Sequence, residues 1–288
     1  MAESEGHIFV PGLLNTEFDP PDSDFAGFDF EVDSSWWSKV RKSSVPWDLF
    51  AVKDCFSTMD SLFQIMEKGE KDFSSFIAMT QKTGRGQYKR KWYSTKGNLT
   101  VSIHIPDIFK NQWSENYLPL ILGNLLAESL SDFGVDAKIK WPNDIFFKGQ
   151  KLGGILVEKK NGFYIAGAGL NLFSSPPEEE LDDDFSVKPV SLLKEGIKVN
   201  SPLIFWDAVL ERLFKFFDKR LAKETPSDLI NSLIQKLVWL GEEVFLDDPY
   251  NGVKKYILKG LSDEGGLVLN DGRETRVVYS GRIRSVNN

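Results

Sequence analysis

The pattern of apolar residues changes once along the chain, near Leu240–Gly241. Before this point, apolar runs of strand length alternate with longer segments of helical spacing, which favours a sheet covered by helices. After it come five short strand-like runs separated by Gly, Asn and Asp turns. That pattern is typical of a small all-β unit of about fifty residues. The sequence therefore predicts an α+β fold, with a mixed β-sheet flanked by helices and then a small C-terminal β-barrel.

The individual elements follow from periodicity and from turn residues. Strands are expected at 48–56, 76–79, 98–105, 138–141, 145–147, 151–159 and 162–172. Helices are expected at Met59–Lys68 with Ser57 or Thr58 as N-cap, at Tyr117–Phe133, at Leu203–Ala222, and at Asp228–Leu240 ended by Gly241. Residues 174–190 predict a polar loop. The expected domains are an N-terminal extension (1–47), a catalytic domain (48–240) and the β-barrel (241–288).

The N-terminal segment carries most of the charge imbalance. Residues 1–35 hold nine acidic side chains and no Lys or Arg, whereas the whole chain has 42 acids and 35 bases. We expect residues 1–47 to form an irregular arm anchored by phenylalanines. The segment has the wrong sign for a transit peptide and is too short and acidic for a helix-turn-helix, so no DNA partner is expected.

Several classes of protein are disfavoured by simple counts. Cys55 is the single cysteine, so no internal disulfide is expected, which fits a reducing compartment such as the cytoplasm. No apolar run reaches the length of a membrane span, and the first residues lack the pattern of a signal peptide. We therefore expect a cytoplasmic protein with no membrane partner. Dimerisation through an edge strand, giving a homodimer, is allowed by the sequence but no feature specifies it.

The first segment with chemical content runs from Gly84 to Trp92 (GRGQYKRKW). Five cations lie within ten residues here: Lys82, Arg85, Lys89, Arg90 and Lys91. Glycines, backbone amides and cations in one loop can cradle an anion such as a phosphate, and Trp92 can stack on a planar ring. The segment matches neither the phosphate loop of nucleotide hydrolases nor a dinucleotide fingerprint. Taken alone, it is equally well explained as a solvated basic loop.

The second segment combines KWPND (140–144) with KLGGILVE (151–158). Asn143 offers both a donor and an acceptor, which suits reading of a base edge. Lys151 opens an apolar strand, and Gly154 removes a side chain from it, which leaves room for a ligand against the sheet. Taken alone, a hairpin with a Pro-Asn-Asp turn explains the same residues.

Together, these motifs closely resemble the biotin protein ligase family. Ser-Thr at 57–58, Gln81, GRGxxxRxW, KWPND, KxGGILVE and GAGLN (167–171) occur in the family's order, and the resemblance covers about residues 48–172. It implies a biotin–lipoate ligase catalytic domain, related to class II synthetases, with an SH3-like β-barrel after it. The nearest alternatives are a lipoate–protein ligase, a non-catalytic biotin-binding regulator and a basic-loop nucleic-acid binder.

The resemblance implies a reaction in two steps. The biotin carboxylate first attacks the α-phosphate of ATP, which gives biotinyl-5′-adenylate, and a lysine of a biotin carboxyl carrier domain then takes the biotin. No enzyme nucleophile is needed, which agrees with a chain whose only histidines are His7 and His104. Mg²⁺ is expected to accompany the triphosphate.

Family resemblance also implies the roles of individual residues. Lys151, Arg85 and Arg90 would neutralise the reacting anions, and Asp144 is either an orienter of the incoming lysine or a turn acid. Biotin would contact Ser57, Thr58, Met59, Gln81, Arg85, Gly86, Gln87, Lys151 and Gly154. ATP would contact Arg85, Arg90, Trp92, Asn143, Lys151, Ala168 and Asn171. Two positions depart from the pattern, because Gln87 stands where many relatives have arginine and Met59 stands where a polar residue is common.

Overall fold

A computed structural model gives the structure of the chain, which forms two compact units. It describes residues 30–32, 38–40, 47–69, 73–105, 115–177, 187–199, 201–220, 225–248 and 252–286. The first unit comprises 1–107, 156–175 and 191–214, and the second 108–155, 176–190 and 215–288. Most of the predicted extension 1–47 and the centre of the predicted loop 174–190 lie outside the described residues.

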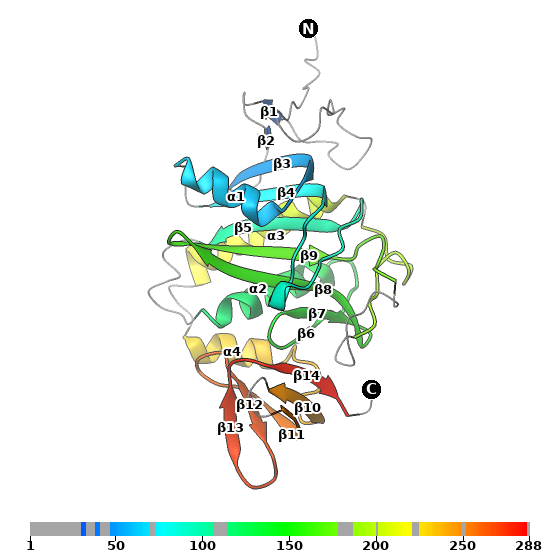
Figure 1. The fold of residues 1–288 in the computed structure, drawn as a ribbon, viewed down its shortest axis with the longest axis vertical. Coiled ribbons are helices and arrows are strands. Elements are labelled where there is room, and N and C mark those ends of the chain that lie inside the picture. The colour runs from blue at the N-terminus through cyan, green and yellow to red at the C-terminus, as the bar shows by residue number, and fades with distance from the viewer. Residues whose placement is uncertain are drawn as a thin grey trace. The chain divides into compact units, whose positions relative to one another are not determined.

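The first unit is built on a mixed sheet (Figure 1). Its strands are β1 (Phe30–Val32), β2 (Ser38–Val40), β3 (Asp48–Cys55), β4 (Ser74–Gln81), β5 (Leu99–Ile105) and β9 (Phe163–Leu170), hydrogen-bonded in that order. β3 and β4 run parallel, while β4, β5 and β9 pair antiparallel. The parallel pair needs a crossover, which α1 (Thr58–Glu67) supplies. β8 (Gln150–Lys160) passes from the second unit into the first.

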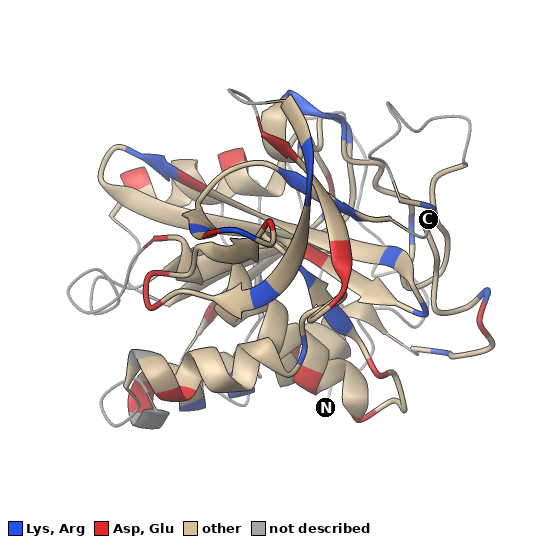
Figure 2. Cartoon of the chain, turned by 90° about the horizontal axis from the view of Figure 1, so that it is seen from below, with Lys and Arg blue, Asp and Glu red and all other residues tan. Residues whose placement is uncertain are grey.

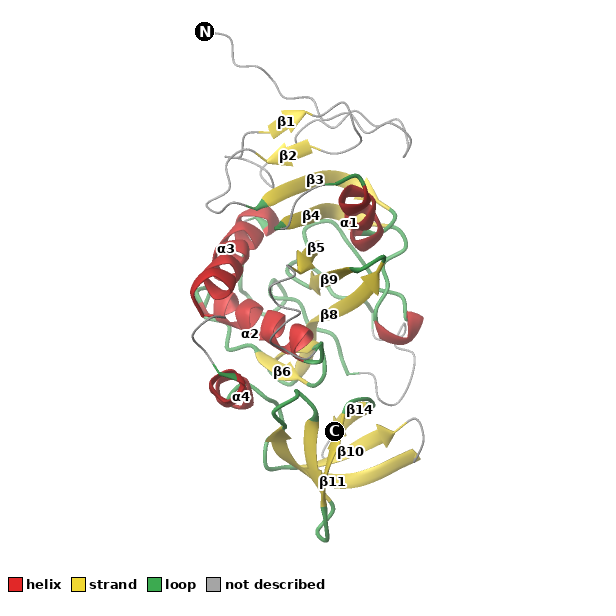
Figure 3. Ribbon diagram, turned by 90° about the vertical axis from the view of Figure 1, so that its left-hand side faces the viewer, coloured by secondary structure: helices red, strands yellow, loops and turns green. Residues whose placement is uncertain are grey.

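Two helices cover opposite faces of this sheet (Figure 3). The apolar side of α1 packs with Phe76 and Ala78 of β4 in one buried cluster. α3 (Pro202–Lys215) contacts the alternate face, where the Trp206 indole donates a hydrogen bond of 2.8 Å to Ser75 Oγ. Side chains of a strand alternate between faces, so β4 is buried on both sides.

The second unit contains an antiparallel meander and a separate all-β sheet. The meander comprises β6 (Lys138–Lys140), β7 (Asp144–Phe147) and the first half of β8, and it packs against α2 (Tyr117–Ser131). Five further strands form an antiparallel sheet in the order β13-β12-β11-β10-β14. They are β10 (Glu243–Asp248), β11 (Gly252–Leu261), β12 (Leu267–Asn270), β13 (Thr275–Val278) and β14 (Arg282–Ser285). The predicted small all-β unit at the C-terminus is thus confirmed.

The prediction Leu203–Ala222 is met by helical structure as far as Arg220, beyond which residues 221–224 lie outside the described part of the chain, whereas the prediction Asp228–Leu240 was too long. α3 stops at Lys215, and Phe216–Arg220 continues as a π-helical segment. α4 (Pro226–Ile234) ends well before Leu240, because the following residues turn to pair with β6. Ile139 N donates to Lys236 O at 2.8 Å, and Val238 N donates to Ile139 O at 3.0 Å. Tertiary pairing therefore ends the helix, rather than the glycine at 241.

The N-terminal arm was expected to be irregular, but two of its described segments, 30–32 and 38–40, are short strands. β1 and β2 pair antiparallel, and β2 pairs with β3 through Ser38 opposite Ala51 and Lys39 opposite Phe50. Among the helices that the structure describes, none is long and apolar enough to cross a bilayer. The Cys55 thiol is buried, and this burial raises its pKa to about 12. Lys and Arg residues, and Asp and Glu residues, occur on strands as well as on helices (Figure 2).

Candidate active site

Residues 84–92 fold back on themselves as a narrow hairpin in the first unit. Gly86 N donates to Arg90 O and Trp92 N donates to Gly84 O, both at 2.8 Å. A single 3₁₀ turn, η1 (Gln87–Lys89), closes the hairpin. The basic segment is therefore a defined loop, with Arg85 on its outgoing arm and Arg90 on its return.

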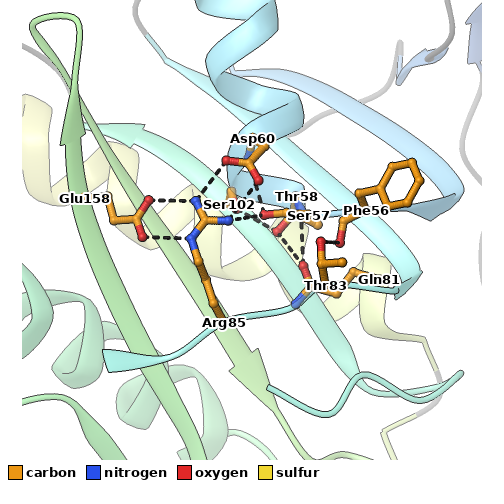
Figure 4. Close-up of polar contacts among 9 residues, drawn as sticks. All are labelled: Phe56, Ser57, Thr58, Asp60, Gln81, Thr83, Arg85, Ser102 and Glu158. Carbon is orange, nitrogen blue, oxygen red and sulfur yellow. Dashed lines mark hydrogen bonds and ion pairs between the residues drawn. The ribbon is translucent and has the colours of Figure 1, made fainter. Parts of the chain in front are cut away.

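The guanidinium of Arg85 lies between two carboxylates (Figure 4). Its Nε and Nη2 donate to the two Glu158 oxygens at 2.8 and 2.7 Å. Nη1 and Nη2 donate to the two Asp60 oxygens at 2.8 and 2.9 Å, and Nη1 also reaches Ser57 Oγ at 3.1 Å. Hydrogen bonds to Glu158 and then Asp60 raise the pKa of Arg85. Sequence reasoning missed both acids, because Asp60 and Glu158 are 25 and 73 residues away from Arg85.

The polar side chains expected to hold the biotin ring system do come together. Thr58 N donates to Gln81 Oε1 at 3.2 Å, and Ser102 Oγ donates to Thr58 Oγ1 at 2.8 Å. Ser57 caps α1 by accepting from Asp60 N. Ser57 and Thr58 are both only 2% exposed, so these hydroxyls form a small polar group inside an otherwise apolar region. Ser102 was not predicted as a site residue, because its position within the strand expected at 98–105 gave no sign of a polar contact. In the structure that strand is fully buried.

The glycines of the GAGLN motif in β9 accommodate side chains of this chain. A Cβ at Gly167 would lie 2.9 Å from Met59 Sδ, and a Cβ at Gly169 would overlap the Trp92 ring. Met59 is therefore a core residue packed on β9, and the Trp92 ring occupies the space that a side chain at position 169 would fill. Any larger residue at 167 or 169 would displace them.

Asn171 follows β9 and is 2% exposed. Its Oδ1 accepts no hydrogen bond from any residue that the structure describes, although Leu192 N donates to its backbone carbonyl at 3.0 Å. A buried acceptor without a partner is costly. A nucleotide hydroxyl or amino group donating to it would remove that cost, so Asn171 fits the expected ATP site. Ala168 is half-buried between the two glycines.

The second unit holds a group of two lysines and one carboxylate. Asp144 Oδ2 lies 3.1 Å from Lys140 Nζ, and Asp144 Oδ1 lies 2.6 Å from Lys151 Nζ. Burial by itself raises the pKa of Asp144, but the charges and hydrogen bonds of Lys151 and Lys140 outweigh it and lower the pKa to about 2. Lys140 is 8% exposed and Lys151 is 34% exposed, so Lys151 is the more accessible cation. Lys140 had no predicted role, although its spacing of four residues from Asp144 was visible.

Asn143 and Gly154 surround this group. Asn143 Nδ2 donates to Ile155 O at 2.6 Å, and Ile155 N donates back to Asn143 O at 2.9 Å, which fixes the turn against β8. Gly154 pairs with Asp144 across the strands. A Cβ at Gly154 would meet only ordinary contacts, 3.6 Å from Asp144 Oδ1 and 3.7 Å from Lys151 Cε. Protein packing alone does not require this glycine, which agrees with room kept for a ligand.

The two groups belong to different units, so a single pocket that contains both Lys151 and Arg85 stays a prediction. The assignments of Gly86, Gln87 and Arg90 to substrate also stay predictions. Within each unit, the structure brings the expected residues together: Ser57, Thr58, Gln81 and Arg85 in the first, and Asn143, Asp144, Lys151 and Gly154 in the second.

Proteins of known function or structure are similar to this chain in sequence and in fold. Residues 56–168 match the biotin/lipoate A/B protein ligase family. The biotin--[acetyl-CoA-carboxylase] ligase of Mycobacterium tuberculosis is 28% identical over 216 residues, which cover 72% of this chain and 77% of that protein. The bifunctional ligase/repressor BirA of Escherichia coli is 38% identical over 112 residues, but that match covers only 36% of this chain and 35% of the relative. The biotin protein ligase from Aquifex aeolicus in complex with biotin and ATP has a TM-score of 0.70 at 27% identity, covering 82% of this chain and 97% of that one.

The fold is a mixed sheet flanked by helices, and in each unit a carboxylate holds a basic side chain: Glu158 holds Arg85 in the first, and Asp144 holds Lys151 in the second. Over residues 56–168 the chain is similar to the biotin/lipoate A/B protein ligase family, and its similarity to proteins named as biotin ligases extends beyond these residues.

Proposed function

We propose that this protein is an ATP-dependent biotin protein ligase, which joins biotin to one lysine of a biotin carboxyl carrier domain such as that of acetyl-CoA carboxylase. The observation that carries the proposal is Lys151, an accessible ammonium aimed by Asp144 at 2.6 Å beside Gly154, a glycine that the packing does not require. A relative named as a biotin--[acetyl-CoA-carboxylase] ligase and one solved with biotin and ATP support it.

The first step joins two anions. One oxygen of the biotin carboxylate attacks the α-phosphorus of ATP, the bond to the bridging oxygen breaks, and pyrophosphate leaves with the electron pair. The enzyme's task is to neutralise both groups and hold them in line. Lys151 would supply the positive charge between the carboxylate and the α-phosphate, and Arg90 would assist from the hairpin.

The second step transfers the biotin. The carrier lysine, as a neutral amine, attacks the carbonyl carbon of the adenylate, the bond to phosphate breaks, and AMP leaves while one proton passes to solvent. Asp144 is a poor base for this proton, because its pKa of about 2 is far below that of a lysine, about 10.4. Asp144 therefore acts by orienting Lys151 and the incoming amine.

The remaining residues would bind and align the substrates. Ser57, Thr58 and Gln81 would hydrogen-bond the ureido ring, and the backbone at Arg85–Gly86 with Gln87 would line the rest of biotin. Trp92 and Asn143 would hold the adenine, with Ala168 and Asn171 beside the adenylate. Met59 would contribute an apolar contact beside β9 rather than a polar contact to the ligand, because it packs on Gly167.

Mg²⁺ would arrive with ATP as part of that substrate. In the described part of the chain, no three His, Cys, Asp or Glu side chains gather in a way that could hold a metal ion. The phosphates themselves would supply its oxygen ligands. We propose a cytoplasmic enzyme without a DNA partner, and with the domains 1–47, 48–240 and 241–288.

A direct assay tests the function. The full chain is incubated with ATP, a carrier domain and radiolabelled biotin or lipoate, and the label on the carrier is measured. Biotin labelling that depends on ATP is the expected result. Labelling with lipoate instead would assign a lipoate–protein ligase, and pyrophosphate exchange without transfer to any carrier would indicate a regulator.

A further inference from the structure

The side chain of Arg85 has no hydrogen-bond donor left for a ligand. A guanidinium carries five N–H donors in a fixed fork. Two donate to Glu158, two to Asp60 and one to Ser57 Oγ, at 2.7 to 3.1 Å (Figure 4). In this arrangement Arg85 is satisfied entirely by acceptors of its own unit.

The charge of the group has the wrong sign for binding an anion. One guanidinium faces two carboxylates, so the three side chains together carry a net charge of −1. Their side chains are 27%, 46% and 32% exposed for Arg85, Asp60 and Glu158, so solvent screens each pair only in part. A bound carboxylate or phosphate would have to displace one of these acids before it could reach Arg85.

The three side chains come from three separate segments. Arg85 lies on the outgoing arm of the hairpin 84–92, Asp60 lies in the first turn of α1, and Glu158 lies on β8. Bidentate carboxylate contacts fix a guanidinium in direction as well as in distance. The contacts therefore tie the hairpin, which carries Arg90 and Trp92, to the helix that begins beside Ser57 and Thr58.

We propose that Asp60 and Glu158 are positioning residues. Their ion pairs with Arg85, called the clamp from here on, hold the hairpin 84–92 in the position that substrate binding requires. The proposal rests on the proposed function, since the hairpin is where biotin and the adenine would lie. Arg85 then has a structural role in the site, and Lys151 and Arg90 neutralise the reacting anions.

The direction in which Glu158→Gln changes the activity distinguishes this positioning role from direct contact of Arg85 with substrate. If Arg85 must bind an anion itself, Glu158→Gln removes a competitor and should leave activity unchanged or raise it. If Glu158 and Asp60 position the hairpin, Glu158→Gln and Asp60→Asn should loosen it and should speed release of biotinyl-5′-adenylate. Arg85→Lys keeps the charge but loses the fork, so the clamp predicts a loss like that of Glu158→Gln.

Two measurements on the full chain test the clamp. The first is the rate of trypsin cleavage at Lys82–Lys91 without ligand, which does not depend on biotin chemistry. We expect it to rise roughly threefold to tenfold in Glu158→Gln and Asp60→Asn. The second compares the rate at which the adenylate dissociates with the rate at which it forms. In both variants the dissociation rate should rise by a similar factor, and the formation rate should change less.

Glu243→Gln is the matched control, because it removes one carboxylate from an exposed ion pair of 2.9 Å with Lys255 in the C-terminal sheet. It should change neither rate. If Glu158→Gln melts at a lower temperature than the assay permits, Asp60→Asn and Arg85→Lys decide in its place. Unchanged trypsin cleavage in folded variants, or adenylate formation that rises in Glu158→Gln, would overturn the clamp. A wild-type chain that forms no adenylate at all would overturn the proposed function, while the trypsin comparison would still report on the clamp.

Discussion

Lys151 Nζ lies 2.6 Å from Asp144 Oδ1, and the other oxygen of that carboxylate is taken by Lys140 at 3.1 Å. One acid thus holds two ammonium groups, and the group keeps a net positive charge. Since Lys140 is nearly buried, Lys151 is the lysine left to approach a substrate.

Replacing Lys151 tests this cation directly. Lys151→Met should lower the rate of adenylate formation by about a hundredfold or more, because a positive charge preorganised between two anions is lost. Lys151→Arg should retain part of the rate. The measurement is ATP–pyrophosphate exchange with biotin, with Lys159→Met at the exposed end of β8 as the control. An exchange rate in Lys151→Met equal to that of the control would contradict the assigned role.

Filling the space at Gly154 should separate folding from binding. A Cβ there meets only ordinary contacts, so Gly154→Ala should melt within about 2 °C of the wild type. The added methyl group should raise the KM for biotin roughly tenfold if biotin lies against this strand. Steady-state kinetics and a thermal melt give both numbers. A KM that does not move would place biotin elsewhere.

The pKa of Asp144 predicts a contribution to acid stability. Its pKa is lowered from 3.8 to about 2 in the folded chain, so its stabilisation is present above pH 4 and is lost as the pH falls toward 2. Over that interval the wild type should lose about 2 kcal/mol more free energy of unfolding than Asp144→Asn. Urea denaturation at several pH values measures the difference. Parallel curves for the two proteins would show that Asp144 is not held as a carboxylate.

Gln87 stands where arginine is common in the resemblance, so a charge-assisted contact to the adenylate is expected to be absent. Gln87→Arg should slow dissociation of biotinyl-5′-adenylate, by an amount corresponding to at most about 1.5–3 kcal/mol. Release of labelled adenylate from the two proteins gives the comparison. Equal off-rates would refute the hypothesis.

Ligand should also protect the hairpin. Biotin together with ATP should slow proteolysis within residues 82–92, because bound substrate covers a loop with exposed cations at Lys82, Lys89 and Lys91. ATP alone serves as the comparison in limited digestion followed by mass spectrometry. Cleavage that is the same with and without both substrates would count against a role for this loop in binding.

Much of the fold was readable from local pattern. Strand β3 with α1 after it, capped by Ser57, was placed to within a residue or two, since alternation and capping are local properties. The end of α4 was not, because Ile139 pairs with the chain just after Ile234 and that partner lies far away in sequence. β1 and β2 were missed for a similar reason, because the pairing of β2 with β3 and of β1 with β2 outweighs an acidic and irregular composition.

The sequence by itself determined which side chains this protein has for its chemistry: the basic hairpin, the Ser-Thr pair, and the lysine that opens a glycine-bearing strand. Motif order is enough for this, because residue type and spacing already limit the chemistry. Only the tertiary structure decided how each cation is held, with Arg85 fastened by Asp60 and Glu158, and Lys151 aimed by Asp144. An ion pair depends on a distance of a few ångströms between atoms, and for Arg85 and Glu158, 73 residues apart, only the folded sheet sets that distance.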